Sequence, residues 1–151
     1  MAVSLEYNLT GRGWSECIVE IDDQRIILTA SFLSDALADL LRAIADVLRG
    51  NDEATASFTE EPGEYRWQFM RVSKDRLSVC ILWFDEFYRN RPKLEGKVIL
   101  KAECRLRTFA GAILSASQRV LETYGLDGYR KQWVRYEFPT TLQANLKKAL
   151  G

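Results

Sequence analysis

The first third of the chain alternates between apolar and polar positions with a period of two, which is typical of β-strands with one buried face. Residues 5–9 show this alternation, and residues 17–21 repeat it after the turn Gly11-Arg12-Gly13. After a second turn, Asp22-Asp23, residues 25–30 form the return strand of a hairpin. The alternation therefore predicts three consecutive antiparallel strands.

The period changes to that of a helix between residues 33 and 48. Seven apolar residues share one face there, and Asp35, Asp39, Arg42, Asp46 and Arg49 stay off it. The apolar residues of this face are Leu33, Leu37, Leu40, Leu41, Ile44, Val47 and Leu48. We expect Ser34 to cap the start of the helix and Gly50 to follow its end.

Four more strands are predicted after this helix, over residues 54–60, 64–72, 76–84 and 97–106. Pro62-Gly63 is expected to form a turn between the first two, and Ser73-Lys74-Asp75 between the next two. A second amphipathic helix is predicted over residues 108–124, with Thr108 as its cap and Gly125 at its end.

Residues 126–139 are turn-rich and aromatic, and a short C-terminal helix is expected to begin at Thr140 or Thr141. The element order then predicts an α+β fold, with an antiparallel sheet of about seven strands and the two main helices packed on one face. A chain of 151 residues suits a single domain over residues 1–151.

Composition narrows the chemistry available to the chain. The sequence contains no histidine, which excludes Ser-His-Asp, Cys-His and histidine-ligated metal sites. Its cysteines, Cys17, Cys80 and Cys104, are widely spaced and are expected to be free, buried thiols in strands. We therefore expect no catalytic residue, no cofactor and no structural metal, and elemental analysis of chelator-washed protein would test the last point.

No secretory signal or long apolar segment is visible, so we expect a cytoplasmic protein that does not enter a membrane.

The net charge is zero. Residues 1–64 nevertheless hold 13 acids and 4 bases, whereas residues 65–151 hold 8 acids and 17 bases. If the two halves interleave in one sheet, their fields cancel; if they stay apart, the molecule presents a dipolar surface to a charged partner.

Residues 60–67 place three carboxylates around the Pro62-Gly63 turn and then enter an aromatic strand. Pairing of this strand with the next around the turn at residues 73–75 sets Tyr65 opposite Trp83 and Glu64 opposite Phe84. Asp85 then lies near Gly63. This sheet corner predicts a binding site for a basic side chain of a partner protein. Its residues are Glu61, Glu64, Tyr65, Trp67, Trp83 and Asp85.

A structural explanation competes with this site, because the aromatic residues could simply fill the core and the carboxylates could be solvated or paired with internal arginines. Asp85-Glu86 is weak evidence for acid–base catalysis, since adjacent strand residues point to opposite faces. Residues 89–107 carry seven bases and two acids. Lys97, Lys101 and Arg105 are expected to share a strand face with Glu103, which makes a basic stripe.

Several segments together resemble a family of stand-alone bacterial proteins to which no activity is attached. The resemblance spans most of the chain and implies a cytoplasmic bacterial domain of this length. It rests on Gly13-Trp14 with Cys17, the segments 29–37 and 60–67, Trp83-Phe84-Asp85, and Ala102-Glu103-Cys104. Small α+β proteins of this kind are comparable in size and class with toxin-neutralising immunity proteins.

The sequence thus favours a non-enzymatic protein-binding module of the immunity or accessory type, with its oligomeric state open. The alternative is a small-molecule-binding protein or a carboxylate-dependent enzyme that uses Glu61, Glu64 or Asp85. Nucleic-acid binding through residues 89–107 is disfavoured, because the stripe lacks the interleaved aromatic residues of RNA-binding sheets and no DNA-binding motif is present.

Overall fold

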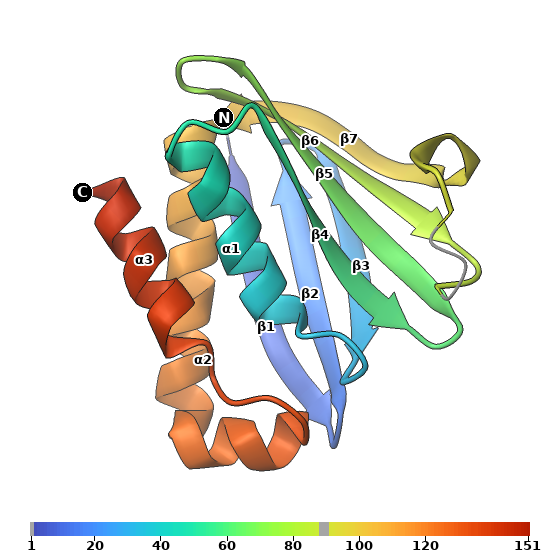
Figure 1. The fold of residues 1–151 in the computed structure, drawn as a ribbon, viewed down its shortest axis with the longest axis vertical. Helices are drawn as coiled ribbons and strands as arrows, with labels where there is room; N and C mark the ends of the chain where they lie inside the picture. The colour runs from blue at the N-terminus through green and yellow to red at the C-terminus, as the bar shows by residue number, and fades with distance from the viewer. Residues whose placement is uncertain (1, 88–90) are drawn as a thin grey trace.

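The computed structural model describes residues 2–87 and 91–151, so Tyr88 and Arg89 lie outside the described residues. Seven strands and three α-helices lie within the described part of the chain (Figure 1). In chain order they are β1 (Val3–Gly11), β2 (Trp14–Ile21), β3 (Gln24–Ser31), α1 (Ala36–Leu48), β4 (Glu53–Glu60), β5 (Gly63–Ser73), β6 (Arg76–Phe84), the 3₁₀ turn η1 (Lys93–Glu95), β7 (Lys97–Arg105), α2 (Leu106–Trp133) and α3 (Thr140–Leu150).

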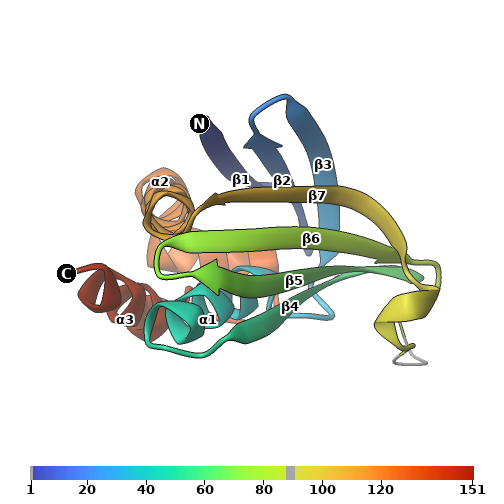
Figure 2. The same cartoon turned by 90° about the horizontal axis from the view of Figure 1, so that it is seen from above.

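The predicted antiparallel α+β class is confirmed, but the seven strands divide between two sheets instead of forming the single sheet that the sequence predicts. β1, β2 and β3 form one sheet in that order, and β4, β5, β6 and β7 form the other. Every described strand pair is antiparallel. Figure 2 shows β3 as the strand of the three-stranded sheet that lies against the four-stranded sheet, with the helices gathered beside the two sheets.

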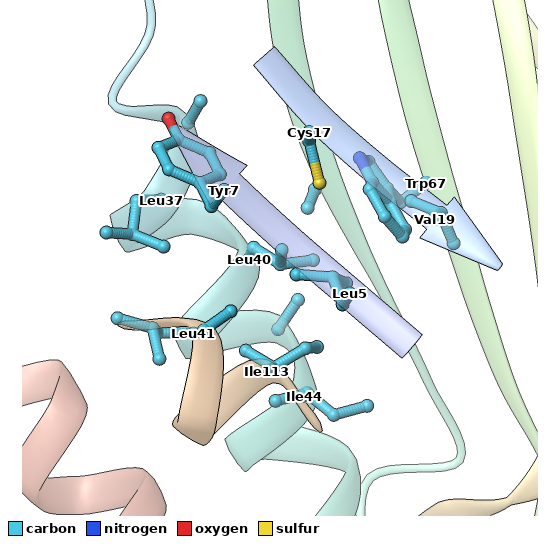
Figure 3. Packing of buried hydrophobic residues seen from close by; sticks show 14 of the residues in the cluster. Leu5, Tyr7, Cys17, Val19, Leu37, Leu40, Leu41, Ile44, Trp67 and Ile113 are labelled. Atoms are coloured by element: carbon cyan, nitrogen blue, oxygen red, sulfur yellow. The ribbon is translucent and has the colours of Figure 1, made fainter. Parts of the chain in front are cut away.

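The two sheets and the three helices share one apolar core. α1 contributes Leu37, Leu40, Leu41 and Ile44, which are fully buried toward Leu5 of β1 and Ile113 of α2 (Figure 3). Aromatic rings continue this core from one sheet to the other. Tyr7 contacts Phe58 of β4, Phe58 contacts Trp67 of β5, and Trp67 contacts Phe109 of α2, with ring centroids 5.5–6.4 Å apart.

The helix ends differ from the predicted ones. Asp35, rather than Ser34, occupies the position before α1 and makes no side-chain capping bond. α2 begins at Leu106, before the predicted cap Thr108, and Asp75 of the β5–β6 turn satisfies its first amides. The Asp75 carbonyl accepts from the Leu106 amide at 3.2 Å, and its carboxylate accepts from the Arg107 amide at 3.0 Å.

Gly125 kinks α2 instead of ending it. Its φ of 70° and ψ of 174° interrupt the helical backbone, and the chain then returns to helix as far as Trp133. The predicted turn-rich segment is therefore helical over its first half. This second part of α2 buries Tyr129 and Trp133, and Tyr129 packs edge-on against Phe138. α3 then begins at Thr140, where Pro139 precedes it without a side-chain cap.

Side chains from the helices cover the outer edge of each sheet, where unpaired backbone groups would otherwise face solvent. Along β1, Arg119 donates to the Leu5 carbonyl at 2.7 Å. The Tyr124 hydroxyl accepts from the Leu9 amide at 3.0 Å and donates to the Leu9 carbonyl at 3.1 Å. α2 thus takes the place of a fourth strand beside β1.

The outer edge of β4 is covered in the same way by α1 and the segment before it. Asp39 accepts from the Ser57 amide at 2.6 Å, and the Ser34 hydroxyl accepts from the Thr59 amide at 2.9 Å. Arg42 donates to the Thr55 carbonyl. Ser34 therefore binds a strand edge instead of capping its own helix.

β3 contacts the second sheet at both of its ends. The Gln24 side-chain amide donates to the Lys101 carbonyl and accepts from the Lys101 amide of β7. At the other end, the Thr29 hydroxyl donates to the Glu60 carboxylate of β4 at 3.0 Å. Side-chain hydrogen bonds, rather than a strand ladder, join the two sheets there.

The three cysteines lie on β2, β6 and β7 and are free thiols, as predicted. Cys17 and Cys104 are buried as expected, whereas Cys80 is only partly buried. Burial raises the pKa of the Cys17 thiol and raises the pKa of Cys104 to about 11. Both are therefore protonated at neutral pH and behave as small apolar side chains. In the described part of the chain, no helix is both long and apolar enough to cross a membrane.

Candidate functional site

The predicted register of the corner strands is confirmed. Tyr65 lies opposite Trp83 and Glu64 opposite Phe84 in the β5–β6 pair. The Tyr65 and Trp83 rings are 4.8 Å apart at an angle of 49°, and both residues are half-buried. Trp83 lies directly over Gly63, where a Cβ atom would come within 2.0 Å of its ring. Glycine at this position lets the indole lie flat against the turn.

On the opposite face of the same strands, Glu64 is part of an internal polar cluster. Its carboxylate accepts from the Ser57 hydroxyl at 2.8 Å and from two nitrogens of Arg66 at 3.2 Å. The Arg66 guanidinium lies over the Phe84 ring, 4.2 Å from its centroid, and donates to the Arg91 carbonyl. Arg66 thus ties β5 to the segment that follows β6.

The six residues of the predicted site therefore fall into two groups. Glu61 and Asp85 are exposed, and Tyr65 and Trp83 are half-buried, so these four retain surface at the corner. Trp67 is 0% exposed and Glu64 is 7% exposed. The expectation that these two face a partner does not fit their burial, because Trp67 fills the aromatic core and Glu64 is paired with Arg66. The binding role of the other four stays a prediction.

Asp85 of the corner and the neighbouring Glu60 also have internal contacts. Asp85 pairs with Arg91 at 2.5 Å, but its side chain remains 75% exposed. Glu60 accepts from Thr29, and the Phe87 amide donates to the Pro62 carbonyl, which holds the chain after β6 against the turn. Burial, with a smaller contribution from Glu60, raises the pKa of Tyr65. The corner is thus a neutral aromatic pair with carboxylates at its rim.

The corner geometry does not assemble a pair of carboxylates for acid–base catalysis. Glu64 lies on the outer face in its arginine pair, while Glu61 and Asp85 lie at the rim. Among the residues that the structure describes, no group of three or more histidine, cysteine or acidic side chains is arranged to hold a metal ion.

The predicted basic stripe is divided by a register shift in the β6–β7 pair. Lys101 and Arg105 lie opposite Cys80 and Arg76, on the outer face of the sheet. A shift between Ile81 and Leu82 places Lys97 opposite Trp83 instead, so the prediction that Lys97 shares the face of Lys101 is wrong. Glu103 pairs with Arg76 at 3.5 Å, which interrupts the positive charge of the stripe.

The acidic and basic halves of the sequence mix in the four-stranded sheet but not in the three-stranded one. β1, β2 and β3 come entirely from the acidic half and form their own sheet. In the other sheet, β6 and β7 come entirely from the basic half. β4 comes from the acidic half and belongs to this sheet because it pairs with β5, which pairs with β6.

Sequence reasoning missed a polar hollow of about 300 Å³ beside β4, lined by Asp39, Arg42, Ser57, Glu64 and Arg66 among others. Its lining comes from α1, β4, β5 and the segment after β6, and the pattern within any one of these elements does not reveal how they pack together.

Comparison with known proteins gives one similarity of fold. The chain resembles one chain of a structure described as the CdiA-CT/CdiI toxin and immunity complex from Enterobacter cloacae, with a TM-score of 0.52 and 9% sequence identity. The match covers 78% of this chain and 99% of that chain. No family model and no curated protein sequence matches this chain. At this identity the similarity is one of fold.

Proposed function

We propose that this chain is a non-enzymatic protein-binding module of the immunity type, which binds and neutralises a toxic protein partner. The observation that carries this proposal is the fold shared with a chain of a toxin and immunity complex over 78% of the present chain. The partition of charge supports it, because a sheet drawn from the acidic half gives a basic partner a complementary field.

The proposed contact at the corner consists of Glu61, Tyr65, Trp83 and Asp85. A lysine or arginine of the partner would lie over the Tyr65–Trp83 pair, where the ring faces attract a cation. Glu61 and Asp85 at the rim would supply the opposite charge. Asp85 would exchange its exposed pairing with Arg91 for the partner's cation, and such exposed pairs contribute little to stability.

A growth assay tests the proposal. The protein encoded beside this chain would be expressed in bacteria alone and together with this chain. An immunity function predicts that the neighbour alone arrests growth and that co-expression restores it. A harmless neighbour, or a toxic neighbour whose effect this chain does not relieve, contradicts the proposal.

The same assay tests the corner. The double variant Glu61→Lys with Asp85→Lys should lose protection, because two attractive charges become repulsive. Glu122→Lys with Asp127→Lys on the exposed face of α2 is the matched control and should protect fully. Equal protection by both double variants would refute the corner while leaving the immunity function intact.

A further inference from the structure

A second surface of this molecule combines exposed apolar side chains with positive charge. It is a hollow of about 380 Å³ on the outer face of the four-stranded sheet, between the strands and η1. Across its floor, Gln68, Cys80 and Lys101 form one row of opposed residues. Leu82 and Val98 form the next row, and Met70 lies toward the other end. Leu94 of η1 forms the wall.

The apolar residues of this hollow are unusually exposed. Leu94 is 92% exposed, Val98 52% and Met70 48%, and all three line the same hollow. In contrast, Leu82 at its floor is 4% exposed. Isolated apolar side chains on a surface are ordinary, but several around one concavity are typical of a site that another molecule covers.

The charge at the hollow selects the chemistry of its occupant. Lys93 and Lys101 line it, and neither has an ion-pair partner within 4.0 Å among the described residues. Both lysines lower the pKa of the Cys80 thiol against the larger, opposite effect of burial. One acid, Glu53, lies among the lining residues. The field over the apolar floor is therefore positive.

Two other occupants fit this surface less well. A second copy of the chain in a two-fold interface would place the positively charged patch of one copy against the same patch of the other. A site for single-stranded nucleic acid needs exposed aromatic rings on which the bases stack. The aromatic residue of the lining, Phe69, is 1% exposed.

We infer that this hollow, which we call the outer-sheet groove, binds an acidic segment of a protein partner that inserts one or two apolar side chains over Leu82. Leu94 and Val98 would pack against those side chains, and Lys93 and Lys101 would pair with the flanking carboxylates. The groove is separate from the corner in its residues and opposite to it in charge. The inference therefore does not depend on the proposed immunity function.

A peptide selection tests the groove without knowledge of the natural partner. A library of random 12-residue peptides on phage would be selected on the full chain, with the double variant Leu94→Asp and Val98→Asp used to remove other binders. We expect enriched peptides that combine leucine, isoleucine or phenylalanine with aspartate or glutamate. Enrichment of basic peptides would overturn the inference. So would a selection that yields no peptide with a preference for the unmodified chain over the double variant.

Charge reversal provides the quantitative test on the best peptide. In fluorescence anisotropy, Lys93→Glu with Lys101→Glu should weaken binding at least 10-fold, and Leu94→Asp should do the same. Lys147→Glu with Lys148→Glu on α3 and Ile27→Asp on β3 are the matched controls, and each should change the affinity less than 3-fold. Equal losses in groove and control variants would overturn the inference. So would sedimentation of the unmodified chain as a dimer that Leu94→Asp dissociates, because a second copy would then occupy the groove.

Discussion

At the scale of single residues, Glu64 and Glu61 show how position determines the role of a carboxylate. The two acids are three residues apart at one turn, yet Glu64 is buried against Arg66 and Ser57 whereas Glu61 is exposed. Removing Glu64 leaves the mostly buried Arg66 guanidinium without its charged partner.

We therefore expect Glu64→Ala to lower the free energy of unfolding by about 2–4 kcal/mol. Glu61→Ala should change it by less than about 0.5 kcal/mol. Urea denaturation of the two variants, followed by tryptophan fluorescence, measures both values. A Glu64→Ala protein as stable as Glu61→Ala would show that the arginine pair contributes nothing to the fold.

Asp35, just before α1, should make stability depend on pH. Burial, helped by nearby Asp39, raises the pKa of this carboxyl from 3.8 to about 6, and its Oδ1 atom is buried without a hydrogen-bond partner. Because the folded pKa exceeds the unfolded one, the folded state gains stability from this group as pH falls from about 6 to about 4.

Asp35→Asn removes this titration and keeps a good residue at the helix start. The variant should be more stable than the unmodified chain at pH 7.5, and the difference should shrink as pH falls through 6 toward 4. Thermal unfolding at four pH values gives the profile. A constant difference across that range would mean that Asp35 has an ordinary pKa.

At the scale of elements, helix side chains replace missing strands. Asp39 and Asp46 both pair with Arg42 on α1, but Asp39 alone of the two also accepts the Ser57 amide on the edge of β4. Asp39→Ala should cost about 1.5–3 kcal/mol, because it leaves a backbone donor of β4 unsatisfied. Asp46→Ala should cost less than about 0.5 kcal/mol.

Chemical denaturation measures both losses, and hydrogen exchange locates them. The Ser57 amide should exchange much faster in Asp39→Ala and remain protected in Asp46→Ala. Unchanged protection of Ser57 would show that water or another group replaces the carboxylate at no cost.

Sequence patterns predict those features of each element that depend on residues close to it in the chain, such as strand register. The alternation in residues 64–72 and 76–84 and the short turn between them determine the β5–β6 register, which is why Tyr65 and Trp83 could be paired from sequence. The same alternation puts Tyr65 and Trp67 on one face but cannot distinguish their burial. Phe109, some 40 positions away, covers Trp67 and leaves Tyr65 near the rim.

Other features depend on contacts that no local pattern contains. Thr108 and Ser34 are good capping residues, yet Asp75 satisfies the start of α2 and Ser34 binds β4. Glycine at position 125 is typical of a helix end, but burial of Tyr129 and Trp133 stabilises a further helical segment beyond it. The division of the strands into two sheets is likewise a feature of the tertiary structure that no local pattern contains.

At the scale of the whole molecule, a three-stranded sheet drawn wholly from the acidic half of the sequence predicts salt-sensitive association with a charged partner. The Debye length falls from about 10 Å at 0.1 M salt to about 3 Å at 1 M. Calorimetry with the neighbour-encoded partner should therefore show weaker binding at high salt. Duplex DNA, as a control, should bind weakly and without sequence preference, and a tight, sequence-selective DNA complex would contradict a protein-binding role.

The bond between Tyr124 and Leu9 joins residues 115 positions apart, and this has a consequence during synthesis on the ribosome. At about 5–20 residues per second, roughly 6 to 23 seconds separate the synthesis of residue 9 from that of residue 124. From the synthesis of β3 until that of α2, the β1–β3 sheet has an open edge that can pair with another nascent chain. A chain ending at Arg105, which lacks α2, should therefore form oligomers through β1 when released, detectable by light scattering. A monomeric truncated chain would mean that β1 becomes ordered only after α2 is made.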